Sequence, residues 1–155
     1  MSHAQNTSLP TRTLAVGDVH HIDLPVRWGD MDAMGHLNNT LYFRLMEEAR
    51  MQIFYSARTQ VAAHTGPILA HASCDFLRPV VYPAMVRVIH RVAAIGRASL
   101  TMDLLLTPPD DQGTPYASGR NVLVWMDYQA NRSEPWPPAL LQHFGTLMLP
   151  APQEG

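Results

Sequence analysis

The first regular pattern in the chain is an alternation of apolar and polar residues over positions 21–28. Its apolar members fall on one side of an extended chain: Ile22, Leu24, Val26 and Trp28. This period of two predicts a half-buried strand. Pro25 has no N–H for a ladder hydrogen bond, so we expect this strand at an edge of its sheet or at a bulge.

From Thr40 towards Gln60 the apolar residues recur with a period of about 3.6, which predicts an amphipathic helix. The expected buried face consists of Tyr42, Leu45, Met46, Ala49 and Ile53. Charged residues, Arg50 among them, fall mostly on the opposite face, which we expect in water. Asn38 or Asn39 is a suitable N-cap, and Gly66-Pro67 stops any helix.

The rest of the chain has the pattern of an antiparallel meander. Strands are predicted near residues 68–77, 86–92, 100–106 and 116–128. Gly96 marks a hairpin, and the last strand, apolar on both faces, is expected in the sheet interior. Residues 140–149 are a short apolar segment, helical or extended. One strand, one long helix and a meander predict an α+β domain whose sheet curls around the helix.

Length and composition fit one domain. The 155 residues are enough for a single core, which we place at residues 19–150 after a flexible N-terminal tail at residues 1–18. Apolar residues make up 46% of the chain and charged residues only 15%. So little charge leaves apolar surface for another subunit to cover, which predicts a homo-oligomer.

Charge and cysteine content narrow the possible partners. The formal charge is -2 and the eleven basic residues are scattered, so we expect no nucleic-acid partner. We see neither a signal-peptide core nor an apolar stretch that could span a bilayer, and we expect no membrane association. The single Cys74 agrees with a reducing compartment, so we predict a cytoplasmic protein. The dispersed histidines argue against a metal site.

Polar residues are concentrated at positions 30–39, DMDAMGHLNN, between the first strand and the helix. Carboxylates here would lie beside free backbone N–H groups at a helix start, where a developing oxyanion can be held. The segment also begins like a calcium loop, with acids at its first and third positions and Gly at its sixth. Its twelfth position is Leu41 instead of a bidentate Glu, which argues against calcium.

The pattern D-x-D-x-x-G-H-x-N-N-x-x-Y followed by an E-E-A-R helix resembles the 4-hydroxybenzoyl-CoA thioesterase family of hot-dog-fold proteins. Later segments resemble that family's landmarks in the same order: 75–79 (DFLRP), 82–83 (YP), 95–99 (IGRAS) and 124–127 (VWMD). The resemblance implies a five-stranded antiparallel sheet wrapped around a long central helix. It also implies a homodimer or homotetramer with active sites at the subunit interface.

The resemblance places the catalytic carboxylate at Asp32, as a nucleophile that forms a mixed anhydride or as a base that activates water. Asn39 stands where some relatives have a histidine; it can donate a hydrogen bond but carries no proton at pH 7. Oxyanion donors are expected near Gly35 or at the helix start. His36 is expected to point elsewhere, either as a ligand contact or as a loop histidine.

Substrate contacts are predicted at Tyr42 of the motif and at Arg78 and Arg97, with Arg120 as a further candidate. A guanidinium group binds phosphate through two parallel hydrogen bonds, which suits the phosphates of coenzyme A or of a carrier-protein arm. No cofactor is expected. No metal is expected either, because a thiolate leaves readily and a carboxylate with oriented dipoles suffices.

The sequence therefore predicts an acyl-CoA thioesterase that releases a free acid and coenzyme A. Acyl-ACP hydrolysis and a non-catalytic acyl-CoA or acyl-ligand binding protein are the alternatives. An acyl-CoA hydratase on the same fold would need a paired Asp and His in another local arrangement, which the sequence does not contain. Chain-length preference and the choice between dimer and tetramer stay open.

Overall fold

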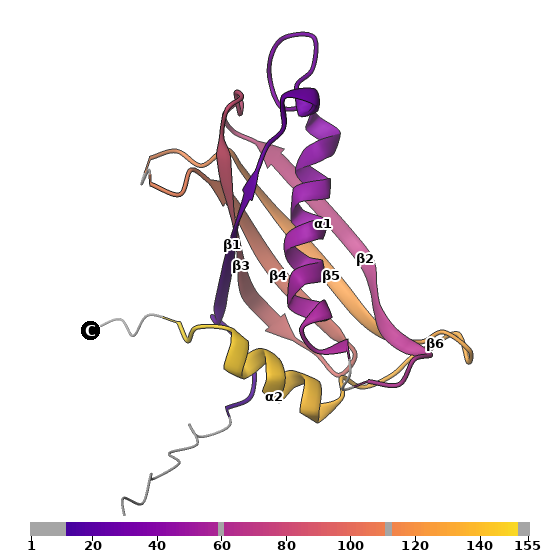
Figure 1. Ribbon diagram of the computed structural model, residues 1–155. Helices are drawn as coiled ribbons and strands as arrows, with labels where there is room; N and C mark the ends of the chain where they lie inside the picture. The colour runs from indigo at the N-terminus through magenta and orange to yellow at the C-terminus, as the bar shows by residue number, and fades with distance from the viewer. Residues whose placement is uncertain (1–11, 59–60, 111–112, 152–155) are drawn as a thin grey trace, which may run out of the picture.

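A single antiparallel sheet curves around one helix in the computed structural model, which describes residues 12–58, 61–110 and 113–151 (Figure 1). The long strands are β1 (Val19–Pro25), β2 (Thr65–Phe76), β3 (Met85–Ile95), β4 (Ser99–Thr107) and β5 (Ala117–Asp127). They lie in the order β1-β3-β4-β5-β2. This confirms the predicted hot-dog architecture, to which the structure adds a two-residue strand, β6 (Arg132–Ser133), paired with β5.

Strand β1 is shorter than the alternating pattern suggested. Leu24 and Val26 are buried, but the strand ends at Pro25, and Trp28 is 78% exposed in the 3-10 turn η1 (Trp28–Asp30). The prediction that Trp28 continues the buried side of the strand is therefore wrong. Pro25 does lie on an edge strand, because β1 pairs within the sheet only with β3 among the described strands.

Helix α1 (Asn39–Tyr55) buries the predicted face against the sheet, and the Asn38 side chain accepts the Thr40 N–H at 3.0 Å as its N-cap. The helix ends at Tyr55, before Gln60. The prediction that Arg50 is exposed is wrong, since only 7% of it is accessible. With the Asn121 amide oxygen turned towards it, Arg50 Nη1 donates at 3.0 Å. This bond from β5 replaces water around the buried charge.

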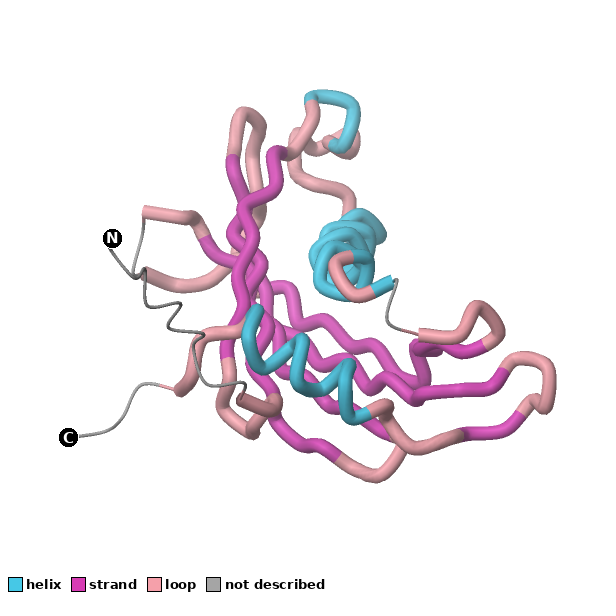
Figure 2. Tube along the Cα trace, turned by 60° about the horizontal axis from the view of Figure 1, so that its bottom comes forward, coloured by secondary structure: helices cyan, strands magenta, loops and turns pink. Residues whose placement is uncertain are grey.

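Helix α2 (Pro138–Leu147) closes one end of the core, so the undecided segment at residues 140–149 is largely helical. Figure 2 shows α1 almost end-on above one face of the sheet, with α2 beside the strands at the near end. Phe144 of α2 is fully buried and meets Phe54 of α1 edge-on, with ring centroids 5.1 Å apart. Trp136 stacks on Phe54 and lies against Trp125, which extends this aromatic cluster.

The folded unit includes residues that we expected in the flexible tail. Leu14 is 4% exposed and its N–H donates to the Leu141 carbonyl of α2. Arg12 pairs with the buried Asp18 at 3.0 Å. The tail boundary at residue 18 is therefore corrected for residues 12–18, whereas residues 1–11 lie outside the described part of the chain.

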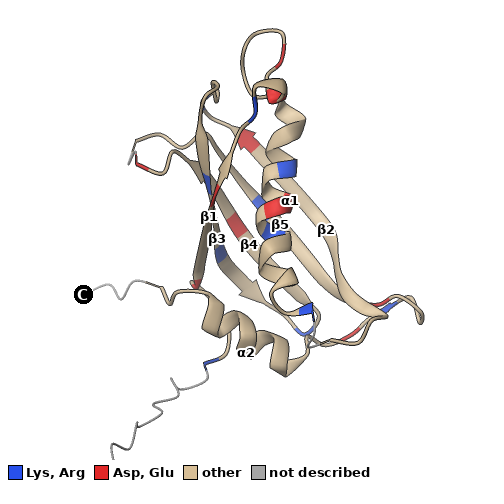
Figure 3. Ribbon diagram, viewed as in Figure 1, with Lys and Arg blue, Asp and Glu red and all other residues tan. Residues whose placement is uncertain are grey.

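In the ribbon of Figure 3, the positions of Lys and Arg are scattered among those of Asp and Glu over several elements and are not concentrated in one of them. Within the residues that the structure describes, no helix combines the length and the apolar character needed to cross a bilayer.

Candidate active site

The polar loop that precedes α1 folds into a tight turn around Asp32. The Asp32 N–H donates to the His36 carbonyl at 2.7 Å, and the Gly35 N–H donates back to the Asp32 carbonyl at 3.0 Å. Oδ1 of Asp32 accepts the N–H groups of Met34 at 2.8 Å and His36 at 3.2 Å. Oδ2 has no hydrogen-bond partner in the described part of the chain, so one carboxylate oxygen fixes the loop and the other is available for chemistry.

Asp30 anchors the same loop from the other side. Its Oδ2 accepts the Arg27 N–H at 2.8 Å, and its carbonyl accepts the Asn38 N–H at 3.0 Å. Arg44 of α1 lies 3.6 Å from its Oδ1. These contacts give Asp30 a structural role, and they fasten the loop to the start of α1.

Five of the seven predicted site residues line one hollow of about 220 Å³, which we call the Asp32 hollow. They are Asp32, His36, Asn39, Tyr42 and Arg78. His36, which was expected to point elsewhere or to contact the ligand, lines the same hollow as Asp32. Gly35 lies outside it and lines, together with Asp32, a wider concavity that reaches Trp28 and Tyr82.

The start of α1 offers one backbone donor at this hollow. Asn38 accepts the Thr40 N–H through its side chain and the Leu41 N–H through its carbonyl. This leaves the Asn39 N–H without an acceptor among the described residues, at the positive end of the helix dipole. The Gly35 N–H is already used within the turn. Of the two predicted sources of an oxyanion donor, the geometry favours the helix start.

Tyr42 forms the inner wall of the Asp32 hollow, and Arg78 lies at its rim. Tyr42 is 2% exposed, and burial raises its pKa, while a hydrogen bond with the Val80 backbone acts in the opposite direction. Its ring meets Phe76 edge-on at 5.0 Å. The Arg78 guanidinium carbon lies 4.7 Å from the centre of the Tyr116 ring, a cation–π contact that holds this cation at the rim.

The other predicted arginines lie elsewhere in the protomer. Arg97 belongs to the hairpin between β3 and β4, where its carbonyl accepts the Trp136 N–H. The eleven residues of β3 separate that hairpin from the end of the sheet that carries the Asp32 loop, a distance of roughly 30 Å. Arg120 pairs with Asp103 at 2.7 Å. Neither side chain lines the Asp32 hollow.

Part of the wall of the Asp32 hollow comes from the end of β2 and the residues that follow it. The sequence alone did not predict that these residues line the site. Phe76, Leu77 and Pro79 line it together with Leu37. Phe76 and Leu77 are 45% and 50% exposed in the protomer. The DFLRP segment marked this region, but nothing in its pattern connected it with Asp32. No group of metal-ligating side chains occurs among the described residues.

A thioester hydrolase is the class of enzyme that this fold and its relatives define. Residues 26–144 match the family model of the thioesterase-like superfamily, and the chain belongs to that superfamily. The proposed thioesterase PA2801 from Pseudomonas aeruginosa is 39% identical, with 79% of this chain and 95% of that one covered and a TM-score of 0.73.

Two further relatives differ in what is known of them. A thioesterase from Thermus thermophilus, solved with coenzyme A and zinc, is 32% identical over 82% of this chain and 92% of its own, with a TM-score of 0.67. The uncharacterised protein YsmA from Bacillus subtilis is 29% identical over 112 residues, which is 72% of this chain and 75% of YsmA.

Proposed function

We propose that the protein hydrolyses an acyl-CoA thioester to a free acid and coenzyme A in the Asp32 hollow. The observation that carries this proposal is that Asp32 and Asn39 border the same hollow. Among the described residues, Asp32 has one carboxylate oxygen without a hydrogen-bond partner, and Asn39 at the helix start has an N–H without an acceptor. The family and its structural relatives support thioester hydrolysis. The choice of acyl-CoA and the role of Asp32 are the parts that we add.

In the general-base route, Asp32 takes a proton from a water molecule, and the resulting hydroxide adds to the thioester carbonyl carbon. The carbonyl oxygen becomes an oxyanion that the Asn39 N–H stabilises. When the C–S bond breaks, the thiolate leaves and takes up the proton that Asp32 received from water, which regenerates the Asp32 carboxylate. In the nucleophilic route, Asp32 attacks the carbonyl carbon itself, and water then hydrolyses the mixed anhydride. Both routes consume only water and need no cofactor.

The remaining predicted residues act on binding. Arg78 at the rim would contact a phosphate of the substrate, and His36 and Tyr42 would bound the space beside the thioester. Arg97 would contribute only if a neighbouring subunit brought its hairpin to the hollow, because it lies at the other end of its own sheet.

A homodimer through β2 belongs to the same proposal. Strand β2 is at the edge of the sheet and pairs within it only with β5 among the described strands (Figure 1). Ile68, Leu69 and Phe76 are each more than 40% exposed along it. Antiparallel pairing of β2 with its copy would satisfy the open backbone groups and cover these side chains. Because the Asp32 hollow borders the end of β2, it would then lie at the subunit interface. Dimers could pair further into a tetramer.

A panel of acyl-CoAs tests the activity by release of the free thiol. The wild type should hydrolyse at least one member, and Asp32→Asn should lose most of that rate on the best substrate. Equal thiol release by the two proteins would contradict the role of Asp32. Tight acyl-CoA binding by calorimetry without hydrolysis would instead indicate a binding protein. Hydrolysis of acyl-ACP alone would move the substrate to a carrier thioester.

A cytoplasmic location, supported by the single Cys74, completes the proposal.

A further inference from the structure

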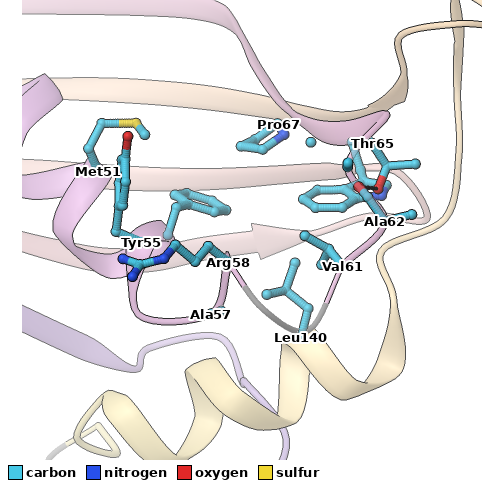
Figure 4. Close-up of a pocket in the computed structure, with 13 residues that line it drawn as sticks. Met51, Tyr55, Ala57, Arg58, Val61, Ala62, Thr65, Pro67 and Leu140 are labelled. Carbon is cyan, nitrogen blue, oxygen red and sulfur yellow. Dashed lines mark hydrogen bonds between the residues drawn. The ribbon is translucent and has the colours of Figure 1, made fainter.

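A second pocket, the distal pocket, lies at the C-terminal end of α1. Its volume is about 330 Å³, and its walls are mostly apolar. Figure 4 shows side chains from α1, the loop after it, β2 and α2 gathered around this space. They include Tyr55, Val61, Pro67 and Leu140, with Trp125 from β5.

The chemistry of the distal pocket fits an apolar ligand. The Thr65 hydroxyl, one of its few polar groups, already donates to the Ala62 carbonyl at 2.9 Å. Trp125 and Phe54 in its wall are held by Trp136, which contacts both rings. Arg58, the charged residue of the wall, lies over the Tyr55 ring with its guanidinium carbon 5.9 Å from the ring centre. The rest of this concave, aromatic-lined space binds hydrocarbon better than water.

Within one subunit this pocket is remote from the reaction. Asn39 borders the Asp32 hollow, whereas Met51, further along the same helix, borders the distal pocket. The helix rises about 18 Å between these two residues. An acyl group whose carbonyl is at Asp32 would therefore have to run along the outside of α1 to reach the distal pocket of its own subunit.

Pairing through β2 would bring the distal pocket of the partner subunit close to the Asp32 hollow. Thr65 and Pro67 at the start of β2 border the distal pocket, and Phe76 at its end borders the Asp32 hollow. Two-fold antiparallel pairing of β2 sets the start of one copy beside the end of the other, about 4.8 Å away. The two-fold axis is perpendicular to the sheet, so both α1 helices stay on the same face. The distal pocket of the partner subunit then adjoins the Asp32 hollow.

We propose that the substrate is a medium-length apolar acyl thioester whose chain crosses the β2 interface and ends in the partner subunit's distal pocket. This inference rests on the proposed function and its β2 dimer. It makes each active site composite, with Asp32 from one subunit and the acyl-end pocket from the other. Each methylene that enters the pocket should raise kcat/KM about four-fold until the pocket is full.

Filling the distal pocket tests its role in chain length. Ala62 is an exposed loop residue in its wall, so Ala62→Phe adds a ring to the pocket without removing a side-chain hydrogen bond. It should lower the ratio of octanoyl-CoA to propionyl-CoA kcat/KM roughly ten-fold or more. Ala130→Phe, in an exposed turn that does not line the pocket, is the matched control and should keep the wild-type ratio. Ala63→Phe, also in the wall, is the second variant, and a thermal unfolding midpoint is measured for each protein.

Heterodimers decide which subunit supplies the pocket. Asp32→Asn and Ala62→Phe subunits are co-expressed with different tags and purified through both. If the pocket comes from the partner, this dimer has one intact composite site and keeps the wild-type octanoyl-to-propionyl ratio. If it comes from the same subunit, the ratio is that of Ala62→Phe. The dimer of wild type and the double variant Asp32→Asn/Ala62→Phe should show the Ala62→Phe ratio if the pocket comes from the partner. It should show the wild-type ratio if the pocket comes from the same subunit.

The outcomes separate this inference from the proposed function. Hydrolysis by the wild type with an unchanged ratio in both Ala62→Phe and Ala63→Phe overturns the distal pocket but leaves the thioesterase intact. A wild-type ratio only in the dimer of wild type and double variant overturns the crossing between subunits. Absence of hydrolysis of any acyl-CoA by the wild type overturns the proposed function, and this inference with it.

Discussion

Asp32 and His36 hold each other through two hydrogen bonds of opposite direction: the Asp32 N–H donates to the His36 carbonyl at 2.7 Å, and the His36 N–H donates to Oδ1 of Asp32 at 3.2 Å. His36 uses only backbone atoms in this pair, whereas Asp32 uses its carboxylate as well. The side chain of His36 is therefore dispensable for the turn, and that of Asp32 is part of it. Substitutions can separate the folding of the loop from its chemistry.

Replacing Asp32 should separate stability from turnover. In Asp32→Asn the amide oxygen can still accept the Met34 and His36 N–H groups, so the free energy of unfolding should change by less than about 1 kcal/mol. Loss of the base should lower kcat about 10²–10⁴-fold. Asp32→Ala should lose the same activity and about 1 kcal/mol of stability besides. Denaturant unfolding and thiol release measure the two effects. An Asn variant that is active but unstable would contradict this division.

Replacing His36 with Ala should leave the fold unchanged. Both of its loop hydrogen bonds come from the backbone, so the free energy of unfolding should stay within about 0.5 kcal/mol of wild type. Because His36 lines the Asp32 hollow, we expect KM for acyl-CoA to rise several-fold. His21→Ala, on the exposed side of β1, is the matched control. An unchanged KM would limit His36 to a structural role in the loop.

Gly35 tests how strongly activity depends on the turn. Its φ of +75° disfavours residues with a Cβ, although an added Cβ would contact nothing within 4 Å. Gly35→Ala should therefore cost about 1 kcal/mol from backbone strain alone, Gly35→Asn less, and Gly35→Val more. We expect turnover by the Val variant, measured well below its unfolding midpoint, to fall further than its stability, since the Gly35 N–H fixes the Asp32 carbonyl. Gly29→Ala, without a positive φ, is the control. Equal losses of turnover and stability would contradict the prediction.

The fold was predictable where one period governs a whole segment. The face of α1 from Tyr42 to Ile53 could be identified because its apolar residues recur every three or four positions along one helix. Arg50 could not be placed in the same way, because its partner Asn121 is on a distant strand that no local pattern connects to the helix. Trp28 was misplaced for the opposite reason: the alternation continues in the sequence after Pro25 and the turn at η1 have ended the strand.

The same distinction holds for the site. Asp32, His36, Asn39 and Tyr42 come from one short segment, so their proximity follows from a single loop and helix start. The wall formed by Phe76 and Pro79 depends on sheet order, which places the end of β2 beside α1. The distal pocket has no motif, because its wall combines residues from the segment 51–67 with Trp125 and Leu140 from two distant elements.

The pair of Arg50 and Asn121 should behave as a buried unit. Asn121→Leu removes the oxygen that Arg50 Nη1 contacts at 3.0 Å and leaves a charge inside the core, so we expect a loss of about 3 kcal/mol in the free energy of unfolding. Arg50→Met/Asn121→Leu should recover much of that loss, because no unpaired group is then buried. Denaturant unfolding of both single variants and the double variant completes the cycle. Additive losses would show that the two side chains are energetically independent.

His90 should make the fold sensitive to acid. It lies on β3 with no exposed surface, and neither ring nitrogen has a hydrogen-bond partner among the described residues. Its pKa is lowered from 6.5 to about 3, first by burial and then by the positive charge of His20 on β1 and of Arg50 on α1; its β4 neighbour is the apolar Leu104.

Below pH 6.5 the unfolded chain therefore binds a proton at His90 that the folded chain does not, and stability falls as the pH falls. Between pH 6.5 and about pH 4 this contributes on the order of 3 kcal/mol to the loss of unfolding free energy. Other groups also titrate in this range, so the informative quantity is a difference between variants. His90→Leu should reduce the pH slope of the unfolding free energy, and His21→Leu, on the exposed side of β1, should retain the wild-type slope. Denaturant unfolding at a series of pH values measures both, and parallel slopes for wild type and His90→Leu would show that His90 is not held neutral in the fold.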